Sequence, residues 1–149
     1  MKRIVLCGSK KFKDEVLRLG HELEKRGYEA VVPREFLVEM NKRDHAMLHF
    51  NEIADKRTDA VLIVNENKGE VENYIGPNSF AEVAMGFYFG KKVYLKNDIY
   101  IPYQDELIGW GVIPLKGEID KTFEWNKRSV PKFAKKRTGP KLTRRKYES

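Results

Sequence analysis

The chain is poor in cysteine and has no long apolar run. Its single cysteine, Cys7, excludes an intramolecular disulfide and a metal site built from cysteines. We expect Cys7, at the end of an apolar run, to act as a small buried hydrophobe. No apolar stretch approaches the ~20 residues of a membrane span. The first residues, MKRIVLCGS, have too short an apolar core for a signal peptide. We therefore expect a cytoplasmic protein with no membrane partner.

Acidic residues are scarce in one part of the chain. Residues 127–149 contain ten Lys or Arg and one acidic residue, whereas residues 1–126 contain 19 basic and 21 acidic residues. The net charge of +7 therefore belongs to a C-terminal tail. With few apolar residues and no helical period, the tail is expected to be disordered. Its charge suits sequence-independent nucleic-acid binding, and a solvated tail without a partner is the alternative.

The remaining residues, 1–126, are long enough for one domain with a buried core. Apolar runs of strand length alternate along them with stretches of helical period. The expected strands are residues 4–7, 29–32, 60–64, 93–95 and 112–115, and the expected helices are residues 14–26, 44–56, 79–89 and 103–110. Residues 34–43 give no clear signal, and residues 66–78 are expected to form a long polar loop.

This alternation predicts the fold class. Strands that alternate with helices form βαβ units, a mostly parallel sheet and right-handed crossovers. We expect a doubly wound, five-stranded α/β sandwich of three layers, flavodoxin-like or Rossmann-like, with strand order 2-1-3-4-5. In that order ligands bind between the carboxyl ends of strands one and three. The crevice would bring together Gly8-Ser9, Asn65 and residues 73–82.

The most informative stretch runs from Asn73 to Leu95, NYIGPNSFAEVAMGFYFGKKVYL. It contains a polar loop, a helix, a stop at Gly90 and a strand. Ser79-x-x-Glu82 predicts a capping box, in which both side chains satisfy backbone N–H groups at the helix start. The alternative is chemical. A carboxylate in the first helical turn is favoured in its ionised form, and it can act as a nucleophile or stabilise an oxocarbenium centre.

Three segments of the chain resemble the nucleoside 2-deoxyribosyltransferase-like superfamily, which includes the deoxynucleoside 5′-monophosphate N-glycosidases. They are the first strand and loop IVLCGS, the strand DAVLIVN, and the loop and helix leading into AEVAMGFYFGKKVYL, and the resemblance spans roughly residues 3–115. It implies that Glu82 is the nucleophile that attacks C1′ of the sugar. It also implies that the Cys7-Gly8-Ser9 loop contacts the ligand, and Ser79 matches the small hydroxyl residue three positions before the Glu.

The chain also departs from the pattern of this superfamily. Its transferases often carry Asp-x-Gly-Thr ahead of the Glu, where this chain has Gly76-Pro77-Asn78-Ser79. The loop after the first strand lacks their aromatic and proline residues. These departures favour a hydrolase, or a relative with a different substrate, over deoxyribosyl transfer between bases.

From the resemblance we expect hydrolysis of an N-glycosidic bond, or glycosyl transfer, on a nucleoside or nucleotide, with Glu82 as catalytic residue and without a cofactor. The residues expected to bind the substrate are Gly8, Ser9, Asn65, Tyr74, Gly76, Asn78 and Ser79. The resemblance and the apolar helix 79–89 also indicate a homo-oligomer. Two alternatives remain open: a non-catalytic nucleotide-binding protein, and a nucleic-acid-associated protein that acts through its tail.

Other residues are weaker candidates. His45 and His49 have the i, i+4 spacing of some metal ligands, but HExxH and an acidic third ligand at a telling spacing are missing. We therefore expect both histidines on a half-exposed helix face, and no metal site. The residues of this helix expected to face inward are Met47, Phe50, Ile53 and Ala54. The candidates for a second acid or base, which no spacing distinguishes, are Asp98, Tyr103, Asp105 and Glu106.

Overall fold

The computed structural model describes residues 2–120, and the predicted tail of residues 127–149 lies outside this range. The described chain forms a five-stranded sheet in the order β2-β1-β3-β4-β5, with every pairing parallel. The strands are β1 (Arg3–Cys7), β2 (Glu29–Val31), β3 (Thr58–Ile63), β4 (Lys92–Leu95) and β5 (Ile113–Pro114). The predicted fold class and strand order are confirmed.

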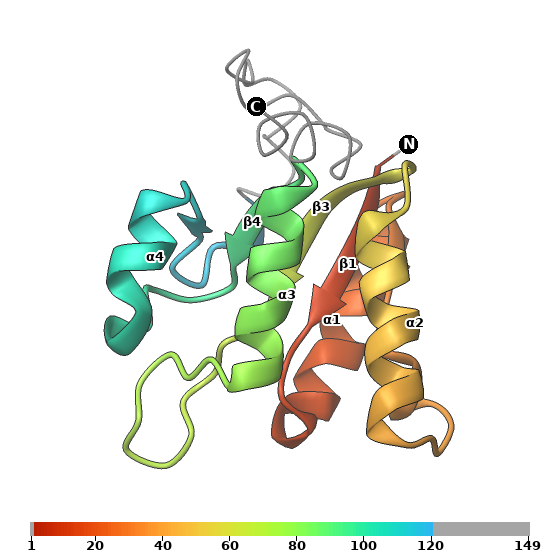
Figure 1. Ribbon diagram of the computed structural model, residues 1–149, viewed down its shortest axis with the longest axis horizontal. Coiled ribbons are helices and arrows are strands. Elements are labelled where there is room, and N and C mark those ends of the chain that lie inside the picture. Colours follow the sequence, from red (N-terminus) through yellow and green to blue (C-terminus); the bar gives the residue numbers. More distant parts are fainter. Residues whose placement is uncertain (1, 121–149) are drawn as a thin grey trace, which may run out of the picture.

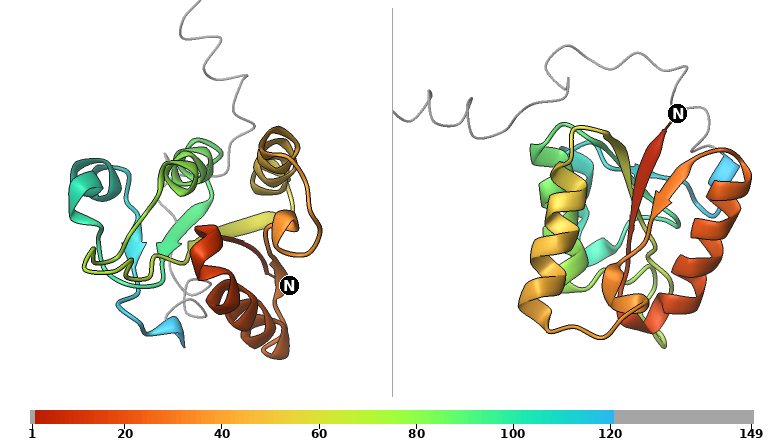
Figure 2. Two further views of the ribbon diagram at one scale, coloured as in Figure 1. Left: turned by 90° about the horizontal axis from the view of Figure 1, so that it is seen from below. Right: turned by 90° about the vertical axis from the view of Figure 1, so that its right-hand side faces the viewer.

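Helices cover both faces of this sheet. They are α1 (Lys13–Lys25), α2 (Lys42–Ala54), α3 (Pro77–Tyr88) and α4 (Gln104–Gly109), with short 3-10 turns η1 (Lys10–Phe12), η2 (Arg34–Phe36) and η3 (Ile101–Tyr103). Helix α1 lies on one face, and α2, α3 and α4 lie on the other (Figures 1 and 2). The result is the predicted three-layer, Rossmann-like sandwich. Within residues 2–120, no helix has the length and apolar character needed to cross a membrane.

Two apolar clusters fill the spaces between the layers, because successive side chains of each strand point to opposite faces. Leu6 of β1 packs in the cluster that contains Leu19 of α1. Its neighbour Cys7 packs in the other cluster, with Ile53 of α2 and Val83 of α3. Cys7 is fully buried, as expected for a small hydrophobe. Its side chain therefore faces the layer that carries α2 and α3.

Helix α3 lies unusually close to the sheet. A Cβ atom on Gly86 would come within 2.8 Å of Val93 Cγ2 and 3.1 Å of Val61 Cγ2, so any larger residue would force α3 or the strands to shift. Gly90 has a φ of 73°, the left-handed conformation that commonly follows a helix end. The predicted glycine stop is confirmed, and it aims the chain directly into β4.

Helix α2 presents a different face to the sheet from the one predicted. Ile53 is buried as expected, but Met47 is 55% exposed. His49 is only 2% exposed, so the half-exposed histidine face is wrong for this residue. The reason is that apolar residues are spread around the whole helix (Ala46, Met47, Leu48, Phe50, Ile53 and Ala54), so the sequence does not mark one inward stripe.

Candidate functional site

The segments predicted to converge meet at the carboxyl edge of the sheet, beside the ends of β1 and β3. The Val64 backbone N–H donates to the Cys7 carbonyl at 2.7 Å, which ties the ends of these strands together. The Asn65 side chain then donates to the Asn73 carbonyl at 3.4 Å, in the loop that leads to α3. This edge is the topological switch point, where open α/β sheets bind their ligands.

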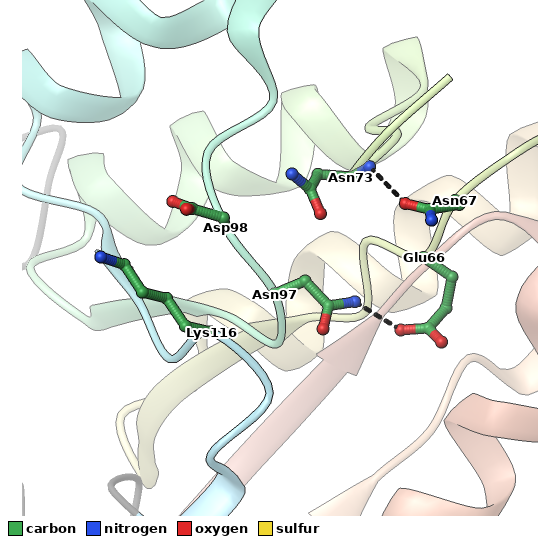
Figure 3. Close-up of a pocket in the computed structure, with 6 residues that line it drawn as sticks. All are labelled: Glu66, Asn67, Asn73, Asn97, Asp98 and Lys116. Carbon is green, nitrogen blue, oxygen red and sulfur yellow. Dashed lines mark hydrogen bonds between the residues drawn. The ribbon is translucent and has the colours of Figure 1, made fainter. Parts of the chain in front are cut away.

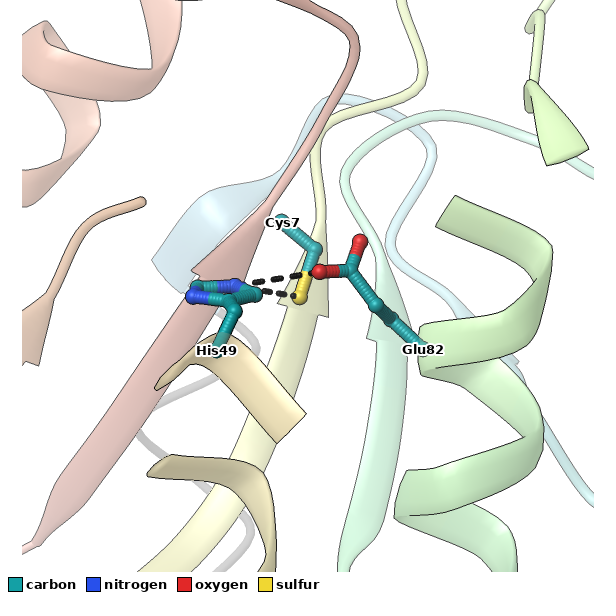
Figure 4. Close-up of side chains that lie close together, drawn as sticks. All are labelled: Cys7, His49 and Glu82. Atoms are coloured by element: carbon teal, nitrogen blue, oxygen red, sulfur yellow. Dashed lines mark hydrogen bonds and ion pairs between the residues drawn. The ribbon is translucent and has the colours of Figure 1, made fainter. Parts of the chain in front are cut away.

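Three buried side chains from separate elements lie together beside this edge: Cys7 at the end of β1, His49 on α2 and Glu82 on α3 (Figure 4). His49 Nε2 lies 3.3 Å from Cys7 Sγ and 3.3 Å from Glu82 Oε2. The same nitrogen is 3.1 Å from the carbonyl oxygen of Leu6. The imidazole therefore lies between a thiol, a carboxyl group and the backbone of β1.

Burial suppresses charge in this cluster. It raises the pKa of Glu82 to about 8, against the hydrogen bond from Cys7, which favours the ionised form. Burial also lowers the pKa of His49 to about 4, with a contribution from the nearby His45. The pKa of the Cys7 thiol lies well above its usual range, through burial first and the Glu82 charge second. At pH 7 these shifts leave both His49 and Glu82 uncharged, so their 3.3 Å contact is not an ion pair.

Two predictions for Glu82 are wrong. Helix α3 begins at Pro77 with Gly76 as its N-cap, so Glu82 lies in the second turn and does not reach the helix start. Within the described chain no side chain caps α3, and the predicted capping box of Ser79 and Glu82 is absent. Proline at the first helical position needs no N–H partner and begins the helix two residues early. The favoured form of Glu82 is consequently the protonated one, because burial outweighs the weaker field beyond the first turn.

A second histidine extends the cluster toward η2. The rings of His45 and His49 are stacked with centroids 5.7 Å apart. His45 Nε2 lies 3.1 Å from Glu35 Oε1. Its other ring nitrogen, Nδ1, is buried without a hydrogen-bond partner among the described residues. Glu35 also contributes to the raised pKa of Glu82. The ionisation of Glu82 is therefore influenced by a carboxyl group that contacts His45 and not Glu82 itself.

The loop after β1 is shaped largely by packing. A Cβ atom on Gly8 would lie 3.1 Å from Val16 Cγ2 and 3.3 Å from the Val64 carbonyl oxygen. Ser9 caps the turn η1, with its hydroxyl accepting a hydrogen bond from the Lys11 N–H at 3.3 Å. Both predicted substrate-binding residues thus hold the loop at the sheet edge, and these roles account for a glycine and a serine there.

Asn65 joins the ends of β3 and β4. Its side-chain N–H₂ group donates to the Asp98 carbonyl at 2.8 Å as well as to Asn73. Its side-chain oxygen accepts from the Asn97 backbone N–H at 3.0 Å. The side chain is fully buried and its polar groups contact the backbone, which fixes the sheet edge, so a ligand contact of Asn65 stays a prediction.

The remaining predicted substrate residues lie on both sides of the start of α3. Tyr74 packs edge-on against Phe12 and Tyr100, with ring centroids 6.5 and 5.7 Å away. Gly76 is the N-cap of α3 and packs under the Tyr74 ring. Asn78 is exposed and Ser79 is buried, three residues before Glu82 in the same helix. The structure brings Ser79 to the side of α3 that is covered, and leaves Asn78 facing solvent.

A separate pocket of about 410 Å³ opens at the same edge, between the ends of β3, β4 and β5 (Figure 3). The residues that line it are Glu66, Asn67, Asn73, Asn97, Asp98 and Lys116. Asn73 and Lys116 have φ values of 56° and 54°, and these are the positive values among the described non-glycine residues. Such backbone conformations cost energy and gather at functional sites. The pocket offers amide, carboxylate and ammonium groups for a ligand rich in hydroxyls.

Of the four predicted acid or base candidates, only Asp98 lines this pocket. Tyr103 packs against Phe80, with ring centroids 4.5 Å apart. Asp105 and Glu106 are exposed in the first turn of α4.

Sequence reasoning missed His49 as a site residue, together with most of the pocket lining. The i, i+4 pair of His45 and His49 was the available signal, but the side chains that meet His49, those of Cys7 and Glu82, come from β1 and α3. A sequence motif records residues on one element. It cannot record residues that folding brings in from other elements.

Comparisons with protein-family models, with curated proteins and with solved structures found no match. The function is therefore argued from the chain's own residues.

Proposed function

We propose that this protein cleaves the N-glycosidic bond of a nucleoside or nucleotide, or transfers its glycosyl group, with Glu82 as the nucleophile. The observation that supports this most is the position of the Glu82 carboxyl group. Residue Glu82 is 6% exposed and lies beside the carboxyl ends of β1 and β3, and a histidine and a thiol contact its carboxyl group. The resemblance of residues 3–115 to the nucleoside 2-deoxyribosyltransferase-like superfamily is part of this proposal.

The proposed reaction is a retaining displacement. The ionised Glu82 carboxylate attacks C1′ of the sugar, and the C1′–N bond breaks as the base leaves with the electron pair and takes up a proton. Water or another acceptor then attacks C1′, which releases the sugar and regenerates the carboxylate. Burial leaves the ionised carboxylate poorly solvated, so it gains electrostatic stabilisation as positive charge develops at C1′.

The test measures release of free base, monitored by chromatography. The substrates are ribonucleosides, deoxynucleosides, their 5′-monophosphates and NAD. We expect release by the wild-type protein and a loss of at least about 10³-fold in Glu82→Gln, which keeps the size of the side chain. Glu106→Gln, which removes an exposed carboxylate on α4, is the matched control and should retain full activity. Equal release by wild type and Glu82→Gln would remove Glu82 from the mechanism.

A second candidate function is non-catalytic binding of a nucleotide or another hydroxyl-rich ligand. The polar pocket at Glu66, Asn97, Asp98 and Lys116 favours it, because its lining does not include Glu82. In this case no substrate of the panel would be cleaved, and a panel member would bind with an affinity that falls in Asp98→Ala and Lys116→Ala. Binding that also falls in Glu82→Gln would join the two sites.

We also propose self-association through the exposed end of α3. Phe87 is 47% exposed, and its ring stacks on Trp110 at a centroid distance of 5.1 Å. Size-exclusion chromatography with light scattering tests this, with Phe87→Ser as the variant expected to shift the mass downward.

The proposed substrate class agrees with the cytoplasmic location predicted from the sequence. Nucleic-acid binding through residues 127–149 remains a prediction about residues outside the described range.

A further inference from the structure

The cluster of Cys7, His49 and Glu82 has the composition of a metal-ligand set. Each side chain offers one ligand atom, and Sγ, the imidazole nitrogen and the carboxylate oxygen all lie within 4.8 Å of one another (Figure 4). The three atoms come from β1, α2 and α3, and all three side chains are buried. A thiolate, an imidazole and a carboxylate are the ligand types that Zn²⁺ and Co²⁺ accept together.

The spacing of these atoms fits tetrahedral coordination. With metal–ligand bonds of about 2.0 to 2.3 Å, neighbouring ligand atoms in a tetrahedron lie about 3.3 to 3.6 Å apart. His49 Nε2 is 3.3 Å from both Cys7 Sγ and Glu82 Oε2. Binding a metal would move the His49 proton to Nδ1 and replace the 3.1 Å contact of Nε2 with the Leu6 carbonyl. Three protein ligands leave the fourth position open, as in catalytic zinc sites.

The charges of the cluster also fit. A dication held by one thiolate, one carboxylate and one neutral imidazole forms a site with no net charge. That balance matters because an isolated charge in a buried position costs several kcal/mol even after relaxation. Glu35 Oε1 lies 3.1 Å from His45 Nε2, beside the cluster. Its carboxylate adds a further negative charge nearby, which favours a bound cation.

We propose that Cys7, His49 and Glu82 form a binding site for a single transition-metal dication of the zinc type. The inference goes beyond the proposed function, since it needs no nucleotide and no turnover. The two are linked in one respect. A Glu82 carboxylate bound to a metal cannot attack C1′, so metal-loaded protein should release no base, and a chelator should restore release.

Cobalt is the sharpest probe, because the chain has a single cysteine. A thiolate-to-Co²⁺ charge-transfer absorption in the full-length protein can come only from Cys7. We expect that band, with the visible bands of four-coordinate Co²⁺, to saturate at one equivalent and to disappear when Zn²⁺ displaces the Co²⁺. Metal is added both to the folded protein and during refolding from urea, so that slow entry into a buried site does not hide binding.

Near-isosteric variants identify the ligands. Cys7→Ser should abolish the charge-transfer band, and His49→Gln and Glu82→Gln should each weaken Co²⁺ affinity at least about 10-fold. His21→Gln, which removes an exposed histidine of α1, is the matched control and should leave the spectrum unchanged. Circular dichroism and urea titration of each metal-free variant confirm that it folds.

Two results would overturn the proposal. One is the absence of the charge-transfer band under both loading conditions, which would leave a neutral hydrogen-bonded cluster. The other is a band that persists with unchanged affinity in His49→Gln and Glu82→Gln. Base release is measured separately in the presence of a chelator. If the metal-free protein releases base but does not bind Co²⁺, the metal site is wrong and the proposed function stands. If the protein binds Co²⁺ but releases no base, the proposed function is wrong and the metal site stands.

Discussion

His49 Nε2 and Glu82 Oε2 lie 3.3 Å apart across the interface of α2 and α3, with both side chains almost completely buried. The pKa of the carboxyl group is raised and that of the imidazole is lowered, so the proton stays on Glu82 at neutral pH. A protein that keeps a carboxyl group in this position gives up stability whenever the group ionises. That cost can be measured as the pH dependence of the free energy of unfolding.

Glu82→Gln should stabilise the protein at alkaline pH. The pKa of Glu82 is about 8 in the folded chain and 4.5 as its ordinary value. Between these pH values the folded state holds one proton more than the unfolded state, so stability falls as pH rises. Removing the ionisable group should raise the free energy of unfolding by about 2 to 4 kcal/mol at pH 8 and change it little at pH 4.5. Urea titrations with a chelator test this, and an unchanged stability at pH 8 would contradict it.

Base release should depend on the ionisation of Glu82. A nucleophile must be ionised, and the pKa of Glu82 is about 8. We expect kcat/KM to rise with pH, about tenfold per unit well below pH 8, and then to level off. Initial rates in chelator-treated buffers of constant ionic strength measure this. A descending limb above pH 8 would instead assign Glu82 as a general acid.

Glu15→Gln should destabilise the protein in a pH-dependent way. The hydrogen bond from Arg18, and then Lys96 at 2.7 Å, lower the pKa of Glu15 to about 2 from 4.5. A lowered carboxyl pKa stabilises the fold above pH 4.5, and this contribution disappears as pH falls through 2. The expected loss is about 1 to 2 kcal/mol at pH 7, since the pair is partly exposed. Asp14→Asn, an exposed neighbour, is the control, and an equal loss at pH 7 and pH 2 would contradict the prediction.

Gly86→Ala should weaken the packing of α3 on the sheet. The new methyl group would lie 2.8 Å from Val93 Cγ2, and relief requires a shift of α3 or β4. Overpacking of this kind typically costs 1 to 3 kcal/mol, partly offset by the better helix propensity of alanine, so we expect a net loss of about 1 to 2 kcal/mol. Gly109→Ala, where no atom lies within 4 Å, should be neutral. A Gly86→Ala protein as stable as wild type would contradict the close crossing.

Asn65→Ala should destabilise the carboxyl edge of the sheet. Its side chain holds the Asp98 carbonyl at 2.8 Å and the Asn97 N–H at 3.0 Å, and both would lose a partner in a buried position. The expected cost is about 2 to 3 kcal/mol in the free energy of unfolding. Asn78→Ala, at an exposed position of α3, should cost less than about 0.5 kcal/mol. Equal effects of the two substitutions would show that the Asn65 contacts contribute little.

Most of the fold was predictable from local patterns in the sequence, above all in the strands. Runs such as Val61-Leu62-Ile63 in β3 are apolar at every position, which is the pattern of a strand buried on both faces of a parallel sheet. Gly90 marked the end of α3, because its positive φ suits glycine. These are local signals with a fixed period, and the short connections between elements leave few topologies for them. The order of the strands followed without knowledge of any side-chain contact.

The candidate site was predictable only in part, for the opposite reason. The sequence placed Glu82 near the carboxyl edge, since a helix must follow a strand there. It could not show that His49 turns inward, because the apolar residues of α2 mark no single face. The protonation of Glu82 was likewise decided by folding, since burial between α2, α3 and the sheet outweighs the local field of one helix. The spacing of apolar residues and the order of the elements along the chain determined the architecture. The contacts and the charge of Glu82 depend on residues that folding brings together from β1, α2 and α3.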